Sequence, residues 1–178
     1  MATPPPNDAG STAPSSEDRL RETIGNAFAR IAPDLERVEA ALRDTLDSRA
    51  ALIPIIGEHL LSSGGKRLRP ALVLLAAELC GYVGPRRIEL AAALELLHSA
   101  TLVHDDIVDL AELRRGRPSA NAIWGNRRAV LAGDFLYARA SSIVVEDGNL
   151  EIVESYARTI RVMAEGELLQ LEHSFDVG

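Results

Sequence analysis

The sequence predicts an all-α protein, and two observations support that prediction. Leu and Ala dominate the apolar residues, whereas aromatic residues make up only 4% of the chain, and such a composition favours helices. From Glu17 onward, apolar residues recur at helical spacing, with no strand alternation of useful length. We therefore expect one helical domain over residues 17–178, preceded by a disordered tail over residues 1–16 that is rich in Pro, Ser, Thr and Ala.

Turn residues divide the helical pattern into separate elements. The expected helices cover Glu17–Ile31, Asp34–Asp47, Pro54–Leu61, Arg69–Cys80, Pro85–Glu112, Arg127–Glu146 and Leu150–Glu172. Gly81 ends one helix and Pro85 opens the next, as stop and start signals do. Asn149 can cap the last helix through its side-chain oxygen. The basic segments Ser62–Arg69 and Leu113–Asn126 are expected loops that are suited to holding a ligand.

Composition and charge argue against several functional classes. A net charge of −7 argues against general nucleic-acid binding, because phosphate backbones attract basic surfaces. No segment reaches the roughly 18 consecutive apolar residues of a membrane span, and the first residues lack the features of a signal peptide. The single cysteine, Cys80, fits a reducing compartment. We therefore expect a cytoplasmic protein with no membrane span and no nucleic-acid partner.

The expected helix over residues 85–112 is apolar around most of its circumference, yet it carries a polar stripe. At about 100° per residue, His98, Thr101, Asp105 and Asp109 fall on one face. A polar stripe on a buried helix must face a partner or a wet cavity, because buried unpaired carboxylates are very costly. Asp105 and Asp109 can share Mg²⁺, which takes carboxylates together with waters and substrate phosphates. A solvated acidic helix face is the alternative, and the pair alone does not decide between the two.

Two basic clusters complete the candidate site. The segment GGKRLRP places Lys66 and Arg69 across a helix start, where they can converge on a diphosphate. The segment RRGRP contains Arg114 and Arg115 just beyond the carboxylates, and guanidinium groups bind a Mg²⁺–diphosphate complex bidentately. Taken singly, these clusters also fit a surface turn and a solubilising loop, and His98 fits a core histidine. Together they match two diphosphate substrates, one chelated by metal and one held by protein cations.

Four segments, GGKRLRP, HSATLVHDDIVD, LRRGRPSANAIWGNRRAVLAGDFLYARA and AEGELLQL, resemble the trans-polyprenyl diphosphate synthase family. The resemblance covers about Leu60 to Leu171 and implies the first half of an isoprenoid-synthase-type helical bundle around a central cavity. It also implies a Mg²⁺-dependent prenyltransferase that condenses isopentenyl diphosphate with an allylic diphosphate. The implied ligands are Asp105 and Asp109 for Mg²⁺, Arg114 for the allylic diphosphate, Lys66, Arg69, His98 and Arg115 for isopentenyl diphosphate, and Gln170 on the opposite cavity wall.

The resemblance also suggests a mechanism and a product length. Mg²⁺ and Arg114 would neutralise the departing diphosphate, so that the allylic C–O bond ionises. The double bond of isopentenyl diphosphate would attack the resulting cation, and proton loss to the released diphosphate would complete the extension. The growing chain descends from the metal along the helix toward its N-terminus. Ala100 and Thr101, one turn below Asp105, are small, and Leu97 lies one further turn down. This low chain-length floor implies a long product, as for quinone side chains.

The chain departs from the family pattern because no second aspartate-rich motif follows before Asp176–Val177–Gly178. Ionisation is therefore expected to be severely impaired in this chain alone. The alternative function is a non-catalytic or truncated helical subunit that binds diphosphate or a partner synthase without turnover. An HD-type metal phosphohydrolase would use His104–Asp105 but leaves GGKRLRP unexplained. We expect a homodimer or a complex with a complementing partner chain.

Overall fold

A computed structural model describes residues 15–62, 65 and 67–174, and it confirms the all-α prediction. The helices of the described residues are α1 Ser16–Asp44, α2 Leu52–Ser62, α3 Leu68–Leu79, α4 Arg86–Val108, α5 Ala120–Trp124, α6 Asn126–Asp147 and α7 Leu150–Ser174. Two short antiparallel strands, β1 Leu113–Arg114 and β2 Arg117–Pro118, form a hairpin. None of the helices in the described ranges combines the length and apolar character needed to cross a membrane. The expected tail lies almost wholly outside the described residues.

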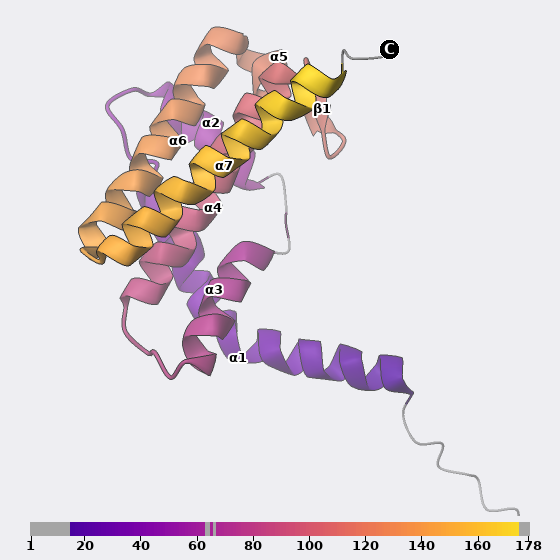
Figure 1. The fold of residues 1–178 in the computed structure, drawn as a ribbon, viewed down its shortest axis with the longest axis vertical. Coiled ribbons are helices and arrows are strands. Elements are labelled where there is room, and N and C mark those ends of the chain that lie inside the picture. Colours follow the sequence, from indigo (N-terminus) through magenta and orange to yellow (C-terminus); the bar gives the residue numbers. More distant parts are fainter. Residues whose placement is uncertain (1–14, 63–64, 66, 175–178) are drawn as a thin grey trace, which may run out of the picture.

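Helix α4 lies at the centre of the bundle and packs against α1, α3 and α6. Its small residues Ala91, Ala92 and Ala93 are at most 1% exposed, which lets the neighbouring helices approach closely. In the main core cluster α4 meets Leu42 of α1 and Leu136 of α6. Helix α7 crosses in front of α4 and α6 (Figure 1). Helix α3 and the start of α1 lie at the bottom of the view, away from α5 and the hairpin at the top. The apolar circumference of α4 thus explains its central position.

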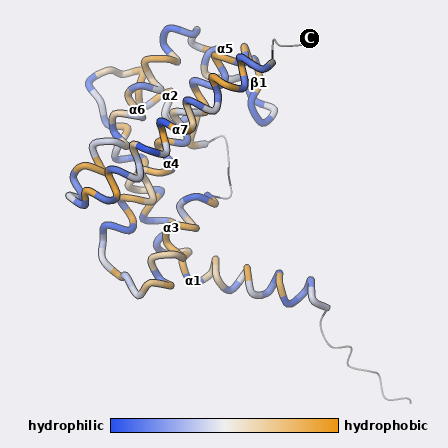
Figure 2. Tube along the Cα trace, viewed as in Figure 1, coloured by the Kyte–Doolittle hydropathy of each residue, from blue (hydrophilic) through white to orange (hydrophobic). Residues whose placement is uncertain are grey.

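Helix α1 is continuous, so the prediction of two helices separated near Pro33 was wrong. It begins at a capping box, in which the Ser15 hydroxyl accepts from the Asp18 amide and the Asp18 carboxylate accepts from the Ser15 amide. A proline inside a helix removes one backbone hydrogen bond and bends the helix without necessarily ending it. Consistent with this, α1 changes direction near its middle (Figure 1). The first segment of α1, residues 15–26, is exposed throughout and mixes hydrophilic and hydrophobic residues (Figure 2).

The boundaries around the candidate site also differ from the prediction. Helix α4 ends at Val108 rather than Glu112, with Asp109 as its C-cap and Leu110 in the left-handed conformation at φ 53°. The expected loop over residues 113–126 contains the β1–β2 hairpin and α5. The predicted cap at Asn149 is confirmed, because its Oδ1 accepts from the Glu151 amide at 2.9 Å. The site therefore lies where a central helix meets an ordered hairpin.

Candidate functional site

A cavity of about 240 Å³ lies between α4, α6 and α7. The carboxyl groups of Asp105 on α4 and Glu167 on α7 line it, and the charge of Glu167 acts on Asp105. One to two turns earlier on the same two helices, apolar and small side chains form its walls, among them Leu97, Ala100, Ile160, Met163 and Ala164. The cavity thus has an acidic end and an apolar body.

The carboxyl group of Asp105 is electrostatically unfavourable in its ionised form. Burial, followed by the charge of Glu167, raises the pKa of Asp105; Asp109 and Asp106 act in the same direction, and Arg114 opposes them. A divalent cation beside these carboxylates would relieve that repulsion. No group of three or more His, Cys, Asp or Glu side chains in the described part of the chain is arranged to hold a metal. Asp105 and Glu167 supply carboxylate oxygens at the cavity, and Mg²⁺ takes one or two carboxylates together with waters and substrate phosphates.

Arg114 connects the hairpin to α4 through Asp106. The Asp106 side chain is 3% exposed, and its Oδ1 accepts from Nε and Nη2 of Arg114 at 2.8 and 2.7 Å. Asn121 of α5 reinforces this junction by donating from Nδ2 to the carbonyl oxygens of Ala111 and Asp106 at 3.0 and 3.3 Å. Asp106 thus holds the guanidinium of Arg114 close to the carboxylates. Residue spacing contains no signal for this pair, because Arg114 lies in a hairpin that was expected to be a loop.

Three arginines act electrostatically on His98. Burial, followed by the charge of Arg69, lowers the pKa of His98; Arg115 and Arg114 act in the same direction, and Glu95 opposes them. These residues come from α3, the hairpin and α4, so the fold gathers cations that the sequence separates. Gly65 lies beside them, since a Cβ added there would be 3.3 Å from Nη1 of Arg115. Lys66, expected in the same cluster, lies outside the described residues.

The residues of the predicted polar stripe on α4 have different environments. Asp105 and Thr101 line the cavity, His98 is half-buried toward the cations, and Asp109 is exposed at the end of the helix. Ala100 and Leu97, two residues of the expected chain-length floor, line the cavity as well. Sequence reasoning missed Glu167, although its place one turn before Gln170 in the segment AEGELLQL was a usable signal. Gln170 itself is exposed.

His104 belongs mainly to the packing between α4 and α6. Its Nε2 lies 3.3 Å from the carbonyl oxygen of Val130 and 3.5 Å from Oδ1 of Asp134. Its ring also fills the space beside Gly133, where an added Cβ would lie 2.4 Å from Nε2. His104 also lines the cavity beside Asp105, but its Nε2 is directed to α6, which does not favour the phosphohydrolase alternative.

Comparison with known proteins identifies relatives of one kind. The family model for polyprenyl synthetase matches residues 51–178. The chain is 44% identical over 140 residues to the octaprenyl diphosphate synthase of Escherichia coli, covering 79% of this chain and 43% of that protein. It is 41% identical over 148 residues to heptaprenyl diphosphate synthase component 2 of Geobacillus stearothermophilus, covering 83% and 46%.

The fold is also similar to a solved structure. The polyprenyl synthase of Caulobacter crescentus complexed with calcium and isoprenyl diphosphate superposes with a TM-score of 0.82 at 44% identity, covering 86% of this chain and 47% of that one. The chain therefore spans about half the length of the relatives it matches.

Proposed function

Because the chain belongs to the polyprenyl synthetase family, we propose that it forms the part of a long-chain prenyltransferase that binds an allylic diphosphate and isopentenyl diphosphate. The cavity between α4, α6 and α7 carries this proposal, because an acidic end continues into an apolar body large enough for part of a prenyl chain. Relatives named for octaprenyl and heptaprenyl products support a long product. The proposed product is a trans-polyprenyl diphosphate of the kind that forms quinone side chains.

We assign Asp105 and Asp109 to Mg²⁺. The repulsion that raises the pKa of Asp105 supports a cation at this position, and a related structure was obtained with calcium and isoprenyl diphosphate. When bound, Mg²⁺ would supply positive charge to the departing diphosphate. Arg114, oriented by Asp106, adds a fixed positive charge on the same side of the cavity.

Isopentenyl diphosphate is assigned to Arg69, His98 and Arg115, together with Lys66. Cations around a half-buried histidine suit a doubly charged diphosphate, because guanidinium groups donate several hydrogen bonds in a fixed geometry. Binding there would hold the double bond beside the allylic carbon, which lowers the entropic part of the barrier. The apolar cavity walls would keep water from the cation. Gln170, on α7, is assigned to the facing wall of the substrate site.

A second candidate function follows from the name of one relative. The heptaprenyl diphosphate synthase component 2 of Geobacillus stearothermophilus is named as one component of a synthase. A non-catalytic helical subunit that binds diphosphate, or a partner synthase, without turnover is therefore the alternative. Either function includes a second chain, as a homodimer or as a complementing partner. We place both in the cytoplasm, since the only cysteine of the chain, Cys80, is free.

Incorporation of labelled isopentenyl diphosphate separates the two functions. The purified chain is assayed with farnesyl diphosphate and Mg²⁺, alone and with a full-length relative. Incorporation by the chain alone, or incorporation by the mixture that exceeds that of the relative alone, supports the synthase. Binding of the diphosphates without incorporation supports the subunit. In calorimetry, Asp105→Ala is expected to remove Mg²⁺-dependent binding of farnesyl diphosphate. Lys66→Ala is expected to weaken the binding of isopentenyl diphosphate by about 1.5–3 kcal/mol. If neither substitution changed the affinity for either ligand, the assignment of the site would be refuted.

A further inference from the structure

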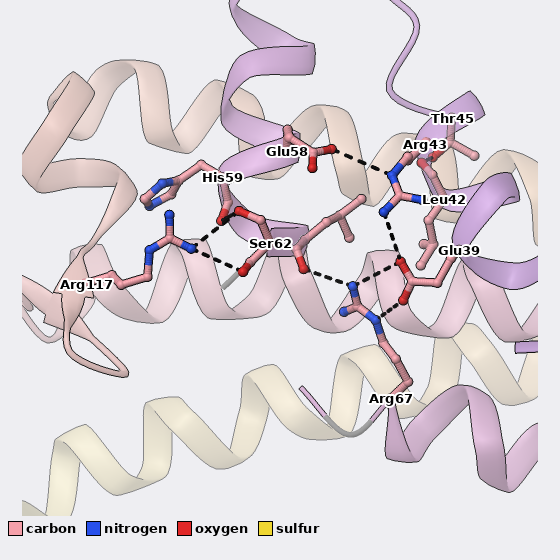
Figure 3. Close-up of polar contacts among 10 residues, drawn as sticks. Glu39, Leu42, Arg43, Thr45, Glu58, His59, Ser62, Arg67 and Arg117 are labelled. Carbon is pink, nitrogen blue, oxygen red and sulfur yellow. Dashed lines mark hydrogen bonds and ion pairs between the residues drawn. The ribbon is translucent and has the colours of Figure 1, made fainter. Parts of the chain in front are cut away.

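Arg67 is a cation of the GGKRLRP segment that the proposed chemistry leaves without a role. Its guanidinium is turned into the bundle, and 17% of its side chain is exposed. It donates to the carboxylate of Glu39 on α1 and, at 3.0 Å, to Oε1 of Glu95 on α4. Its Nη2 also donates to the carbonyl oxygen of Leu61 on α2 at 2.9 Å. A single side chain at the start of α3 therefore contacts three other helices, and Figure 3 shows it directed toward Glu39.

The backbone of Arg67 adopts a conformation that needs such support. With φ 45° and ψ 42°, it lies in the left-handed region, which a non-glycine residue enters only when its surroundings hold it there. Immediately after this turn, the Arg67 carbonyl oxygen accepts from the Ala71 amide at 2.9 Å and α3 begins. Arg69 therefore lies in the first turn of a helix whose start is set by Arg67.

Ser62, at the end of α2, is held by a second arginine. Arg117 of the hairpin donates from Nη1 to the carbonyl oxygen and the hydroxyl of Ser62 at 3.1 and 3.4 Å (Figure 3). The contact between Arg67 and Leu61 joins the start of α3 to the end of α2 directly. These contacts hold the end of α2, the hairpin and the start of α3 in one arrangement.

Arg67 also compensates a buried negative charge next to the cationic cluster. Glu95 is 7% exposed and lies one turn before His98 on α4, and its charge acts on His98. Within the described residues, Glu95 Oε2 has no hydrogen-bond partner, so the ion pair through Oε1 is its main compensation. Burial opposes the charge of Arg67, but hydrogen bonds and charges from Glu39 and Glu95 outweigh it and raise the pKa of Arg67. The guanidinium thus remains charged.

We propose that Arg67 is a positioning residue: by holding α1, α2 and α4 at the start of α3, it sets Arg69 beside His98 and thereby sets the affinity for isopentenyl diphosphate. Arg67 does not contact that ligand in this proposal, since each of its three guanidinium nitrogens already donates to Glu39, Glu95 or Leu61. The inference rests on the proposed function, because it assumes that the cationic cluster binds isopentenyl diphosphate.

Calorimetry on the 178-residue chain tests the inference with two probes, isopentenyl diphosphate and farnesyl diphosphate with Mg²⁺. Arg67→Met is expected to lower the affinity for isopentenyl diphosphate by at least about tenfold. It is expected to lower the affinity for farnesyl diphosphate by less than about threefold. Arg87→Met is the matched control, because the Arg87 side chain is also 17% exposed and joins α4 to Asp34 of α1 in a partly buried ion pair. It is expected to lower the melting temperature comparably and to leave both affinities unchanged.

Every outcome decides the matter. Unchanged isopentenyl diphosphate affinity in Arg67→Met, equal weakening of both probes, or the same weakening in Arg87→Met overturns the inference while the proposed function stands. If Arg67→Met does not fold, Arg67→Lys decides: it keeps the charge but cannot reach three acceptors at once. It is expected to weaken only isopentenyl diphosphate, and an unchanged affinity overturns the inference. A wild-type chain that binds neither probe overturns the proposed function together with this inference.

Discussion

Asp105 places a carboxylate at the end of the cavity, beside Glu167, Asp109 and Asp106. Burial, and then these charges, raise the pKa of Asp105 above its ordinary value of 3.8. A raised folded-state pKa gives stability that is fully present below the unfolded-state value and is lost as the pH rises through the folded-state value. At pH 7 the ionised group therefore destabilises the fold. We expect Asp105→Asn to raise the free energy of unfolding at pH 7 by about 0.5–1 kcal/mol, a gain that shrinks toward pH 4.

Urea unfolding across this pH range measures the effect. Glu36→Gln, at an exposed position of α1, removes one negative charge without touching the site and serves as the control. Asp105→Asn is also expected to abolish Mg²⁺-dependent farnesyl diphosphate binding, because an amide supplies no negative charge to the ion. A variant less stable than the wild type at pH 7 would contradict the electrostatic account.

At the scale of single residues, local spacing could predict which candidate site residues share a helix face, but it could not predict their contact partners. The 3.6-residue period predicted that Thr101 and Asp105 share a face of one helix, and both line the cavity. The pairing of Arg114 with Asp106 depends on a hairpin, and that of Arg67 with Glu39 spans 28 positions. Such contacts are fixed by tertiary packing, which periodicity does not contain. The functional roles assigned to these residues stay predictions.

At the scale of elements, turn signals identified most helices but were misleading at Pro33. The expected break lies between Ile31 and Asp34, whereas the buried side chains of Ile31 before Pro33 and of Val38 and Leu42 after it belong to one continuous α1. Conversely, the apolar pattern predicted that the central helix continues to Glu112. In the structure α4 ends at Val108, shortly before Leu110 adopts the left-handed conformation. Helix ends depend on caps and on neighbouring segments as much as on the pattern itself.

The first part of α1 is expected to contribute little to stability. Residues 15–26 are exposed, and Leu20 and Ile24 are 59% and 50% exposed. Since apolar burial supplies most of the driving force, deleting residues 1–24 should change the free energy of unfolding by less than about 1 kcal/mol. Thermal unfolding followed by circular dichroism measures the change.

Leu42→Ala is the comparison variant for this deletion. The Leu42 side chain is completely buried, and its truncation should cost about 2–5 kcal/mol. A deletion as damaging as Leu42→Ala would mean that the first part of α1 is packed against another chain in solution.

At the scale of the whole molecule, α7 presents an apolar surface that the other described helices leave open. Val162, Leu168 and Leu169 are 53%, 62% and 53% exposed. Large exposed apolar patches promote association, so we expect a particle larger than a monomer at micromolar concentration. The double substitution Leu168→Glu/Leu169→Glu should shift the chain toward the monomer with an unchanged helical spectrum. Light scattering measures both states, and a monomeric wild type would contradict the prediction.

The product length depends on where the cavity ends. Leu97 lines both the 240 Å³ cavity that contains Asp105 and a second cavity of about 430 Å³ between α3, α4, α6 and α7. Its side chain is therefore positioned between the two, whereas Ala100, 1% exposed, borders the first alone. Under the proposed function, a diphosphate held at Asp105 would direct the growing chain past Ala100 and Thr101 toward Leu97. Leu97 would then be the first large side chain on α4 that elongation meets.

Opposite substitutions at these two positions should move the product length in opposite directions. In the smallest active assembly that contains this chain, Ala100→Phe is expected to shorten the product, because a phenyl ring added to a packed site must displace chain atoms. Leu97→Ala is expected to lengthen it by joining the cavities. Chromatography of the dephosphorylated products measures both. If Ala100→Phe left the distribution unchanged while Leu97→Ala lengthened it, the chain would run along α7 rather than α4, and Ala100 would not belong to the floor.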